Sequence, residues 1–192
     1  MIENNNMNEI DIDLKNLTSK EKKEILSNLK AGQTILLSGT VYTARDAAHK
    51  RIANMIKIGE RLPITLDGAI IYYAGPTPAK NGMVIGSCGP TTSARMDKFT
   101  PTLYDLGVIA TIGKGERDKE ISLSCKKNKS LYFCAVGGAG ALAATKIKKC
   151  DVVAFDDLGC ESIKKLEFDK FPLIVATDSK GNDIFKRNEE TK

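Results

Sequence analysis

The feature that most constrains the fold of this chain is a repeated order of short apolar runs, turns and helical stretches. The apolar runs cover residues 34–37, 69–73, 83–85, 108–112, 131–136, 152–155 and 173–176. Helical stretches follow four of them, over residues 44–58, 92–106 (interrupted near Pro101), 117–128 and 139–148. Several runs lack polar–apolar alternation, which is typical of strands covered on both faces. This order predicts an α/β fold with a mixed, largely parallel sheet flanked by helices.

The chain has 192 residues, enough for one domain with a hydrophobic core and few for two. Residues 1–17 are rich in Asn and acidic side chains and are predicted to form a polar N-terminal tail. The domain is then predicted to span residues 18–185, and residues 186–192 form a polar C-terminal tail. We find no internal repeat and no linker.

Two local patterns refine this outline. Thr18 and Glu21 have the spacing of a capping box, which predicts the start of a helix that ends at Ala31 and Gly32. Residues 72–87 hold two strand-like runs around the sequence GPTPAKNG, and this arrangement predicts a hairpin-like excursion from the sheet.

Composition and charge exclude several classes of protein. A net charge of +5 with 42% hydrophobic residues excludes an intrinsically disordered chain. No apolar run approaches the roughly 20 residues that span a bilayer, and the polar start lacks a secretion signal, so we expect a cytoplasmic protein without membrane contact. The basic residues between Lys114 and Lys149 are compatible with RNA binding. Because the lysines at 126–129 and 146–149 are predicted to be solvated helix ends, we expect no nucleic-acid partner.

The cysteines do not predict a metal site. Five cysteines are present, Cys88, Cys125, Cys134, Cys150 and Cys160, without a CxxC motif. The only histidine is His49. Their spacing matches no zinc or ferredoxin-type pattern. We therefore predict no metal ligands in this chain and interpret the cysteines as small apolar residues.

The first candidate site follows the apolar run 34–37. Thr43 and Asp46 have the spacing of an N-cap, which would place Arg45 in the first helical turn and His49 one turn further on the same face. A helix N-terminus attracts an anion by only about 0.3–1 kcal/mol, whereas a bidentate arginine adds charge and planar geometry for a carboxylate. An ordinary capped helix with a surface arginine is the alternative.

A second candidate site is the segment GSCGPTTSARMD, residues 86–97. Gly89 allows a sharp turn, Thr91 and Thr92 place hydroxyl groups at the predicted start of a helix, and Arg95 follows one turn later. Hydroxyl groups there often only cap the helix. Three consecutive hydroxyl residues, Thr91, Thr92 and Ser93, followed by an arginine exceed what capping requires. The segment is therefore a candidate ligand site.

Lys114, between two glycines after the run 108–112, is the third candidate. In sheets of this kind, ligands bind beyond the carboxyl ends of the strands. Two arginines, one lysine and several hydroxyl groups are therefore predicted to converge on one sheet edge. This set suits a small di- or tricarboxylic acid. It lacks an electrophile for removing a proton next to a carboxylate, which another chain would have to supply.

A fourth segment, Gly138-x-Gly140-x-x-Ala143, fits the dinucleotide-binding fingerprint, with Asp156 near the distance of a ribose-binding acid. It occurs late in the chain, whereas the fingerprint normally opens the first βαβ unit. Close packing of a helix on a strand explains it equally well. A free-standing dinucleotide- or anion-binding module is thus an alternative function.

Five motifs resemble the β subunit of iron–sulfur-dependent class I fumarate hydratases and its relative, the L(+)-tartrate dehydratase β subunit. They are TARDAAH (43–49), YYAGPTPAKNGMVIGSCGPTTSARMD (72–97), IGKGE (112–116), AVGGAGALAA (135–144) and AFDDLG (154–159). The resemblance implies a single swivelling β/β/α domain and an α-subunit partner that carries a [4Fe–4S] cluster, and hence a hetero-oligomer. It implies reversible hydration of fumarate to (S)-malate, a tricarboxylic acid cycle reaction. GPTPAKNG resembles the fumarase branch more than the tartrate branch.

The same resemblance implies roles for individual residues. Arg45, Arg95 and Lys114 would bind the substrate carboxylates, and Thr91 would be the base that takes the C3 proton of malate, activated by an acid of the α subunit. Supporting roles would fall to Asp46, His49, Gly89 and Thr92, the first two by holding Arg45 or lining the subunit boundary.

Overall fold

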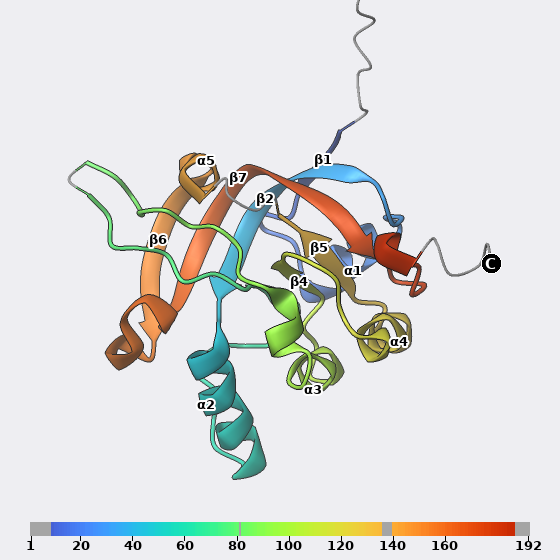
Figure 1. Cartoon of the computed structure of the whole chain (residues 1–192), viewed down its shortest axis with the longest axis horizontal. Helices are drawn as coiled ribbons and strands as arrows, with labels where there is room; N and C mark the ends of the chain where they lie inside the picture. The colour runs from blue at the N-terminus through green and yellow to red at the C-terminus, as the bar shows by residue number, and fades with distance from the viewer. Residues whose placement is uncertain (1–8, 81, 136–139, 187–192) are drawn as a thin grey trace, which may run out of the picture.

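The structure is a computed structural model that describes residues 9–80, 82–135 and 140–186 (Figure 1). The strands are β1 (Ile10–Asp13), β2 (Thr34–Thr43), β3 (Ile70–Tyr72), β4 (Ala110–Gly113), β5 (Leu131–Cys134), β6 (Ile147–Ala154) and β7 (Ile163–Thr177). The α-helices are α1 (Ser19–Ser27), α2 (Asp46–Lys57), α3 (Thr100–Asp105), α4 (Lys119–Asn128) and α5 (Gly140–Thr145). Three 3-10 helices, η1 (Ser93–Met96), η2 (Asp156–Glu161) and η3 (Ile184–Lys186), complete the described elements.

The sheet closes on itself. Strands β2, β3, β4 and β5 are parallel neighbours, and β7 runs antiparallel to both β5 and β2. These pairings form a closed ring of five strands, with β1 added to β2 and β6 added to β7. The predicted α/β class and largely parallel pairing are confirmed. The predicted layout of a flanked sheet is wrong, because the 15-residue strand β7 reaches both edges and joins them into a barrel.

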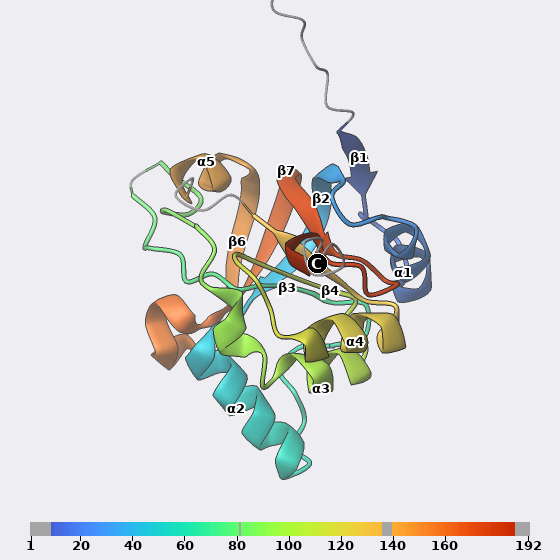
Figure 2. The same cartoon turned by 45° about the vertical axis from the view of Figure 1, so that its right-hand side comes forward.

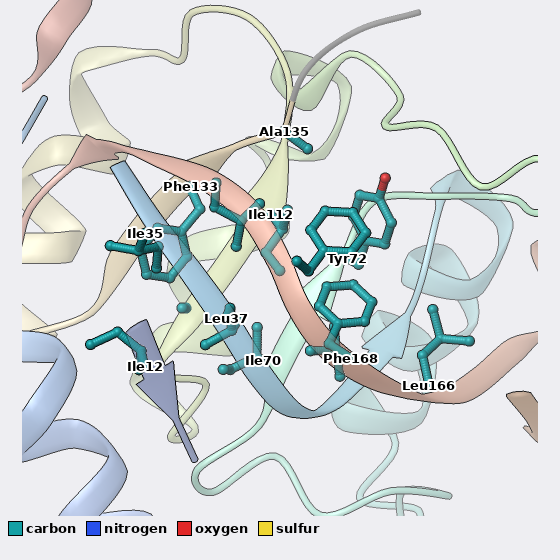
Figure 3. Close-up of a cluster of buried hydrophobic side chains, with 14 of the residues drawn as sticks. Ile12, Ile35, Leu37, Ile70, Tyr72, Ile112, Phe133, Ala135, Leu166 and Phe168 are labelled. Atoms are coloured by element: carbon teal, nitrogen blue, oxygen red, sulfur yellow. The ribbon is translucent and has the colours of Figure 1, made fainter. Parts of the chain in front are cut away.

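The barrel is filled by one hydrophobic cluster. Figure 3 shows members of this cluster from four strands of the ring: Ile35 and Leu37 of β2, Tyr72 of β3, Phe133 of β5 and Phe168 of β7. The Phe168 and Phe171 rings stack with centroids 4.1 Å apart, and the Tyr72 ring meets both edge-on. Aromatic side chains of this size contribute much of the burial that stabilises a small barrel.

A second cluster lies outside the barrel, beneath α2, α3 and α4, which occupy one side of the molecule (Figure 2). Ile71 and Tyr73 point into this cluster, whereas Ile70 and Tyr72 point into the barrel. Strand β3 is therefore covered on both faces, which explains why its sequence is apolar without alternation.

Part of the predicted N-terminal tail is a β-strand. Residues 10–13 form β1, which pairs in parallel with β2, and Ile12 and Leu14 are buried. Within the predicted tail of residues 1–17, residues 10–13 thus form a short edge strand, because alternate apolar residues there bury one face. The C-terminal residues 187–192 lie outside the described residues, and the predicted domain boundaries stay predictions.

The lysine clusters differ in structure. The one at 126–129 lies at the end of α4, as predicted. The one at 146–149 lies at the junction of α5 and β6, so its prediction as a helix end is wrong. Of the predicted helix 139–148, residues 140–145 form α5, whereas residues 147–148 belong to β6, so the prediction is wrong at its end; residue 139 lies outside the described residues.

The remaining local predictions are mixed. The capping box at Thr18 is confirmed, but α1 ends at Ser27, before Ala31. Pro101 stands in the first turn of α3 instead of interrupting a longer helix.

The excursion over residues 72–87 is confirmed as a hairpin-like loop. Thr77 N–H donates to the Ser87 carbonyl at 3.1 Å, and Gly86 N–H donates back to Thr77 at 3.2 Å. The loop extends beside β6 and α5 (Figure 1). Residues 83–85 within it are not a strand, which corrects the prediction from their apolar run. No helix in the described part of the chain is long and apolar enough to cross a membrane.

Candidate functional site

The predicted site residues lie at one edge of the barrel. Strands β2 to β5 end at Thr43, Tyr72, Gly113 and Cys134, and because they are parallel these ends share an edge, here called the carboxyl edge. Arg45 follows β2 and Lys114 follows β4, and the segment that carries Arg95 returns to this edge at the end of the loop after β3. They are not scattered over different faces of the barrel.

Backbone bonds draw the loop after β3 across this edge. Ala74 pairs with Pro90, and Thr91 N–H donates to the Tyr73 carbonyl at 2.7 Å. Thr92 forms a parallel bridge with Lys114. The segment GPTTSARMD is thereby fixed between the ends of β3 and β4, with the backbone of Thr92 beside that of Lys114.

Arg95 forms a two-point ion pair with Asp46. Its Nε donates to Oδ1 at 3.1 Å, and its Nη2 donates to Oδ2. The hydrogen bonds from Arg95 stabilise the charged carboxylate and lower the pKa of Asp46. The positive charges of Arg95 and Arg45 lower it further, by smaller amounts. Both side chains are partly exposed, so Arg95 remains accessible to a ligand at the carboxyl edge.

Arg45 occupies the N-cap position of α2 and lies 3.7 Å from Glu161, from its Nη2 to Oε1. Its guanidinium rests against Gly75, where a Cβ atom would come within 2.6 Å of Nη1. Its Nε is buried without a partner among the described residues. Arg45 and Arg95 thus approach the same edge from α2 and η1, each beside a carboxylate.

The predicted N-cap at Thr43 is wrong. Thr43 is the last residue of β2 and is buried; its hydroxyl donates to the Ser162 carbonyl and accepts from Lys164 N–H. The N-terminus of α2 is satisfied instead by Glu161, whose Oε2 accepts from Ala47 N–H at 2.8 Å. Glu161 comes from η2, far away in sequence, so the local pattern gave no sign of it.

His49 is buried beneath Arg45. Its Nδ1 donates to the Arg45 carbonyl at 2.9 Å, and its ring lies between Tyr73 and Phe99. Burial lowers the pKa of His49 to about 4, so the ring is neutral and cannot serve as a cation for a substrate. His49 thus contacts Arg45 through its backbone carbonyl, and the supporting role that the resemblance implies for His49 stays a prediction.

Lys114 is held by its backbone. Its N–H donates to Ser93 Oγ at 3.0 Å, and its carbonyl accepts from Ser93 N–H at 3.0 Å. The space for this contact depends on Gly113, where a Cβ atom would lie 1.9 Å from Ser93 Oγ. Ser93 thus holds the backbone of Lys114, a contact that the sequence does not reveal, since Ser93 appears there only as one of three consecutive hydroxyl residues.

Gly140 of the dinucleotide-type fingerprint packs against the excursion. A Cβ atom there would lie 2.4 Å from Ser87 Oγ and 3.0 Å from Gly89 N, and its carbonyl accepts from Cys88 N–H. Gly138 lies outside the described residues, and α5 has only six residues. Close packing with Gly89 accounts for the glycine at this position.

The donor set does not fit an iron–sulfur cluster in this chain. Burial raises the pKa of the Cys88 and Cys125 thiols to about 12, which opposes the thiolate form that iron requires. Within residues 9–80, 82–135 and 140–186, no three Cys, His, Asp or Glu side chains lie close enough to hold a metal ion. The described residues therefore provide no ligand set for such a cluster.

Two hollows lie away from these residues. One, of about 770 Å³, lies between the end of α1 and residues 178–186. The other, of about 230 Å³, lies between α2 and α3, and of the predicted site residues only His49 lines it. The cationic groups are thus at an open edge and not in either hollow.

Comparison with known proteins agrees with the motifs. A family model described as the fumarase C-terminus matches residues 1–188. Fumarate hydratase 2 of Leishmania major is 38% identical over 180 residues, which are 93% of this chain and 32% of that protein. The putative L(+)-tartrate dehydratase subunit beta of Methanocaldococcus jannaschii is 42% identical over 174 residues, 88% of this chain and 89% of that subunit. The L(+)-tartrate dehydratase subunit beta of Escherichia coli is 35% identical over 179 residues, 91% and 88% of the two chains. The chain thus spans about a third of the fumarate hydratase and nearly all of the two beta subunits.

Proposed function

The chain belongs to the fumarase C-terminus family, and on that premise we propose that it supplies the cationic half of a hydro-lyase active site. The proposed reaction is the reversible hydration of fumarate to (S)-malate. The other half of the site, with the [4Fe–4S] cluster, is assigned to an α subunit. The observation that carries this proposal is the placement of Arg45, Arg95 and Lys114 at one carboxyl edge.

The two arginines suit a dicarboxylate because their geometry is already fixed. A guanidinium has five N–H donors, and Asp46 accepts only two of those of Arg95. The remaining donors are free to bind a substrate carboxylate while Asp46 holds the plane of the group. Glu161 forms a looser ion pair with Arg45, with 3.7 Å between Oε1 and Nη2. Two planar cations and the Lys114 ammonium would neutralise a dianion and fix its orientation.

Thr91 is proposed to carry the proton. In the dehydration direction its Oγ would accept the C3 proton of malate, while its own hydroxyl proton passes to the carboxylate of an acidic residue of the α subunit. The C2 hydroxyl would leave as water after taking a proton from a second acid group of that subunit. A threonine hydroxyl needs such a neighbour to act as a base. The hydrogen bond from Thr91 N–H to Tyr73 fixes the backbone from which the hydroxyl projects. The cluster, when bound to the partner, supplies Lewis-acid polarisation of the substrate.

A second candidate is the β subunit of an L(+)-tartrate dehydratase. It is favoured by coverage, since this chain matches 89% of the Methanocaldococcus subunit. Both substrates are dicarboxylates, so the same cationic edge would bind either. They differ at C3, where tartrate carries a second hydroxyl.

Reconstitution tests the proposal. The purified chain, a cluster-loaded α subunit and their mixture are each assayed with fumarate, malate and L(+)-tartrate, by the ultraviolet absorbance of fumarate and by product analysis. We expect activity in the mixture only, with fumarate and malate as substrates. Activity on tartrate alone would select the second candidate. Activity of the isolated, metal-free chain would contradict both.

A further inference from the structure

A buried arginine that the proposed chemistry does not use lies beneath the carboxyl edge. Arg117 is 3% exposed, and its Nε donates to Asp97 Oδ1. Its Nη2 donates to Thr100 Oγ1 at 2.8 Å. The guanidinium carbon lies 5.3 Å from the centroid of the Tyr73 ring and 4.9 Å from that of Tyr132. The guanidinium is therefore held in position by a carboxylate, a hydroxyl and two aromatic rings.

The partner carboxylate connects two segments of the site. Asp97 follows η1, which carries Arg95, and Arg117 follows Lys114 in the loop between β4 and α4. The second oxygen of Asp97 accepts from Asp118 N–H at 3.0 Å, at the start of α4. The buried carboxylate of Asp97 thus connects the loop that carries Arg95 with the loop that carries Lys114.

We propose that Arg117 and Asp97 are positioning residues, a buried clamp that fixes the loop of Arg95 against the loop of Lys114. The inference rests on the proposed function, since it explains how the two cations keep a common geometry. Nearer the surface, Lys114 N–H donates to Ser93 Oγ and Ser93 N–H donates to the Lys114 carbonyl, while the Tyr132 hydroxyl bridges Ser93 Oγ and the Gly115 carbonyl. The clamp lies beneath these contacts and prevents the loops from sliding apart.

The chemistry of the Arg117–Asp97 ion pair favours a positioning role over a purely stabilising one. Burying an ion pair is often no more stabilising than packing apolar side chains of similar volume. Arg117 also leaves its Nη1 buried without a partner among the described residues, which adds a cost. The free-energy cost of burying Arg117 is explained if its planar, rigid guanidinium sets the distance between the two loops.

The test uses the reconstituted enzyme and three variants. Arg117→Ala removes the clamp, Arg117→Lys keeps the charge without the planar fork, and Lys127→Ala is the control. Lys127 forms a 2.9 Å ion pair with Asp105 that joins α4 to α3 at the exposed surface. We expect kcat/KM to fall about tenfold to a hundredfold in Arg117→Ala, to recover in part in Arg117→Lys or with added guanidinium ion, and to stay unchanged in the control.

Hydrogen exchange on the isolated chain separates this inference from the proposed function. We expect faster exchange over residues 91–98 and 113–118 in Arg117→Ala than in Lys127→Ala, whether or not the wild-type assembly is a hydro-lyase. Unchanged exchange in both loops would overturn the clamp. So would a lower melting temperature with unchanged kcat/KM of the folded enzyme. If Arg117→Ala does not fold, Asp97→Asn is measured in the same way and decides the matter.

Discussion

Arg95 and Asp46 are joined by a two-point ion pair, although Arg95 lies in η1 and Asp46 opens α2. The pair connects the segment that follows β3 with the segment that follows β2. A second two-point pair, between Arg51 of α2 and Asp157 of η2, has both N–O distances at 2.7 Å and lies among residues to which the proposed function assigns no role. The two pairs have the same chemistry, so the second is a natural control for the first.

Replacing Arg95 by lysine should weaken substrate binding. Lysine keeps the charge but cannot offer two parallel N–H groups to a carboxylate, a loss of about 1.5–3 kcal/mol for a charge-assisted contact. In the reconstituted enzyme we expect KM for the dicarboxylate to rise about tenfold or more in Arg95→Lys and to stay near the wild-type value in Arg51→Lys. Equal effects of the two substitutions in steady-state assays would show that Arg95 has no special role.

The Asp46 carboxylate should make stability depend on pH in the acid range. Its pKa is lowered in the folded state, so its contribution is present above the usual pKa of 3.8 and is lost as the pH falls through the lowered value. Because the side chain is partly exposed, the contribution is up to about 1 kcal/mol. Asp46→Asn should therefore be less stable than wild type at neutral pH, with a difference that shrinks below about pH 4. Urea unfolding across this range measures it; a constant difference would contradict the assignment.

His49 should reduce stability as the solution becomes mildly acidic. Its pKa is lowered from 6.5 to about 4 by burial, so the unfolded chain binds the proton first as the pH falls. The free energy of unfolding should fall by about 2 kcal/mol between pH 7 and 5 from this group, and His49→Asn should remove that dependence. Because the chain has one histidine, its imidazole proton NMR signal reports the titration directly. A midpoint near 6.5 in the folded protein would refute the prediction.

Gly113 should not tolerate a side chain. A Cβ atom there would lie 1.9 Å from Ser93 Oγ and 3.0 Å from the Tyr73 ring, so Gly113→Ala must displace the hydroxyl that binds Lys114. We expect a loss of about 1–3 kcal/mol in unfolding free energy and a drop in activity of the reconstituted enzyme. Gly115→Ala is the control, because its Cβ would meet nothing within 4 Å and only its positive φ opposes the change. If only Gly115→Ala lowered activity, the steric account would be wrong.

The sequence predicts the carboxyl edge better than it predicts the barrel. Short runs without alternation are local signals, so the parallel strands and the residues that follow them could be found. Strand β7 mixes charged residues with apolar ones and contains Pro172, so only its end, residues 173–176, is recognisable. Closure of the barrel depends on pairing this strand with β2, which no local pattern reports.

The same distinction applies to the site. Arg45, Thr91, Arg95 and Lys114 stand in motifs next to turns, where their residue types are informative. Glu161 reaches the start of α2 from a distant segment, and its role depends on tertiary contacts. The burial of Arg117 is likewise invisible in the sequence, because arginine is usually exposed.

A crystal structure of the chain assembled with its cluster-loaded α subunit and a bound dicarboxylate tests the central claim most directly. We expect the substrate carboxylates to lie within hydrogen-bonding distance of Arg45, Arg95 and Lys114. We expect Thr91 Oγ to face C3 of the substrate. A dicarboxylate held only by residues of the α subunit, with these cations turned away from it, would contradict the account.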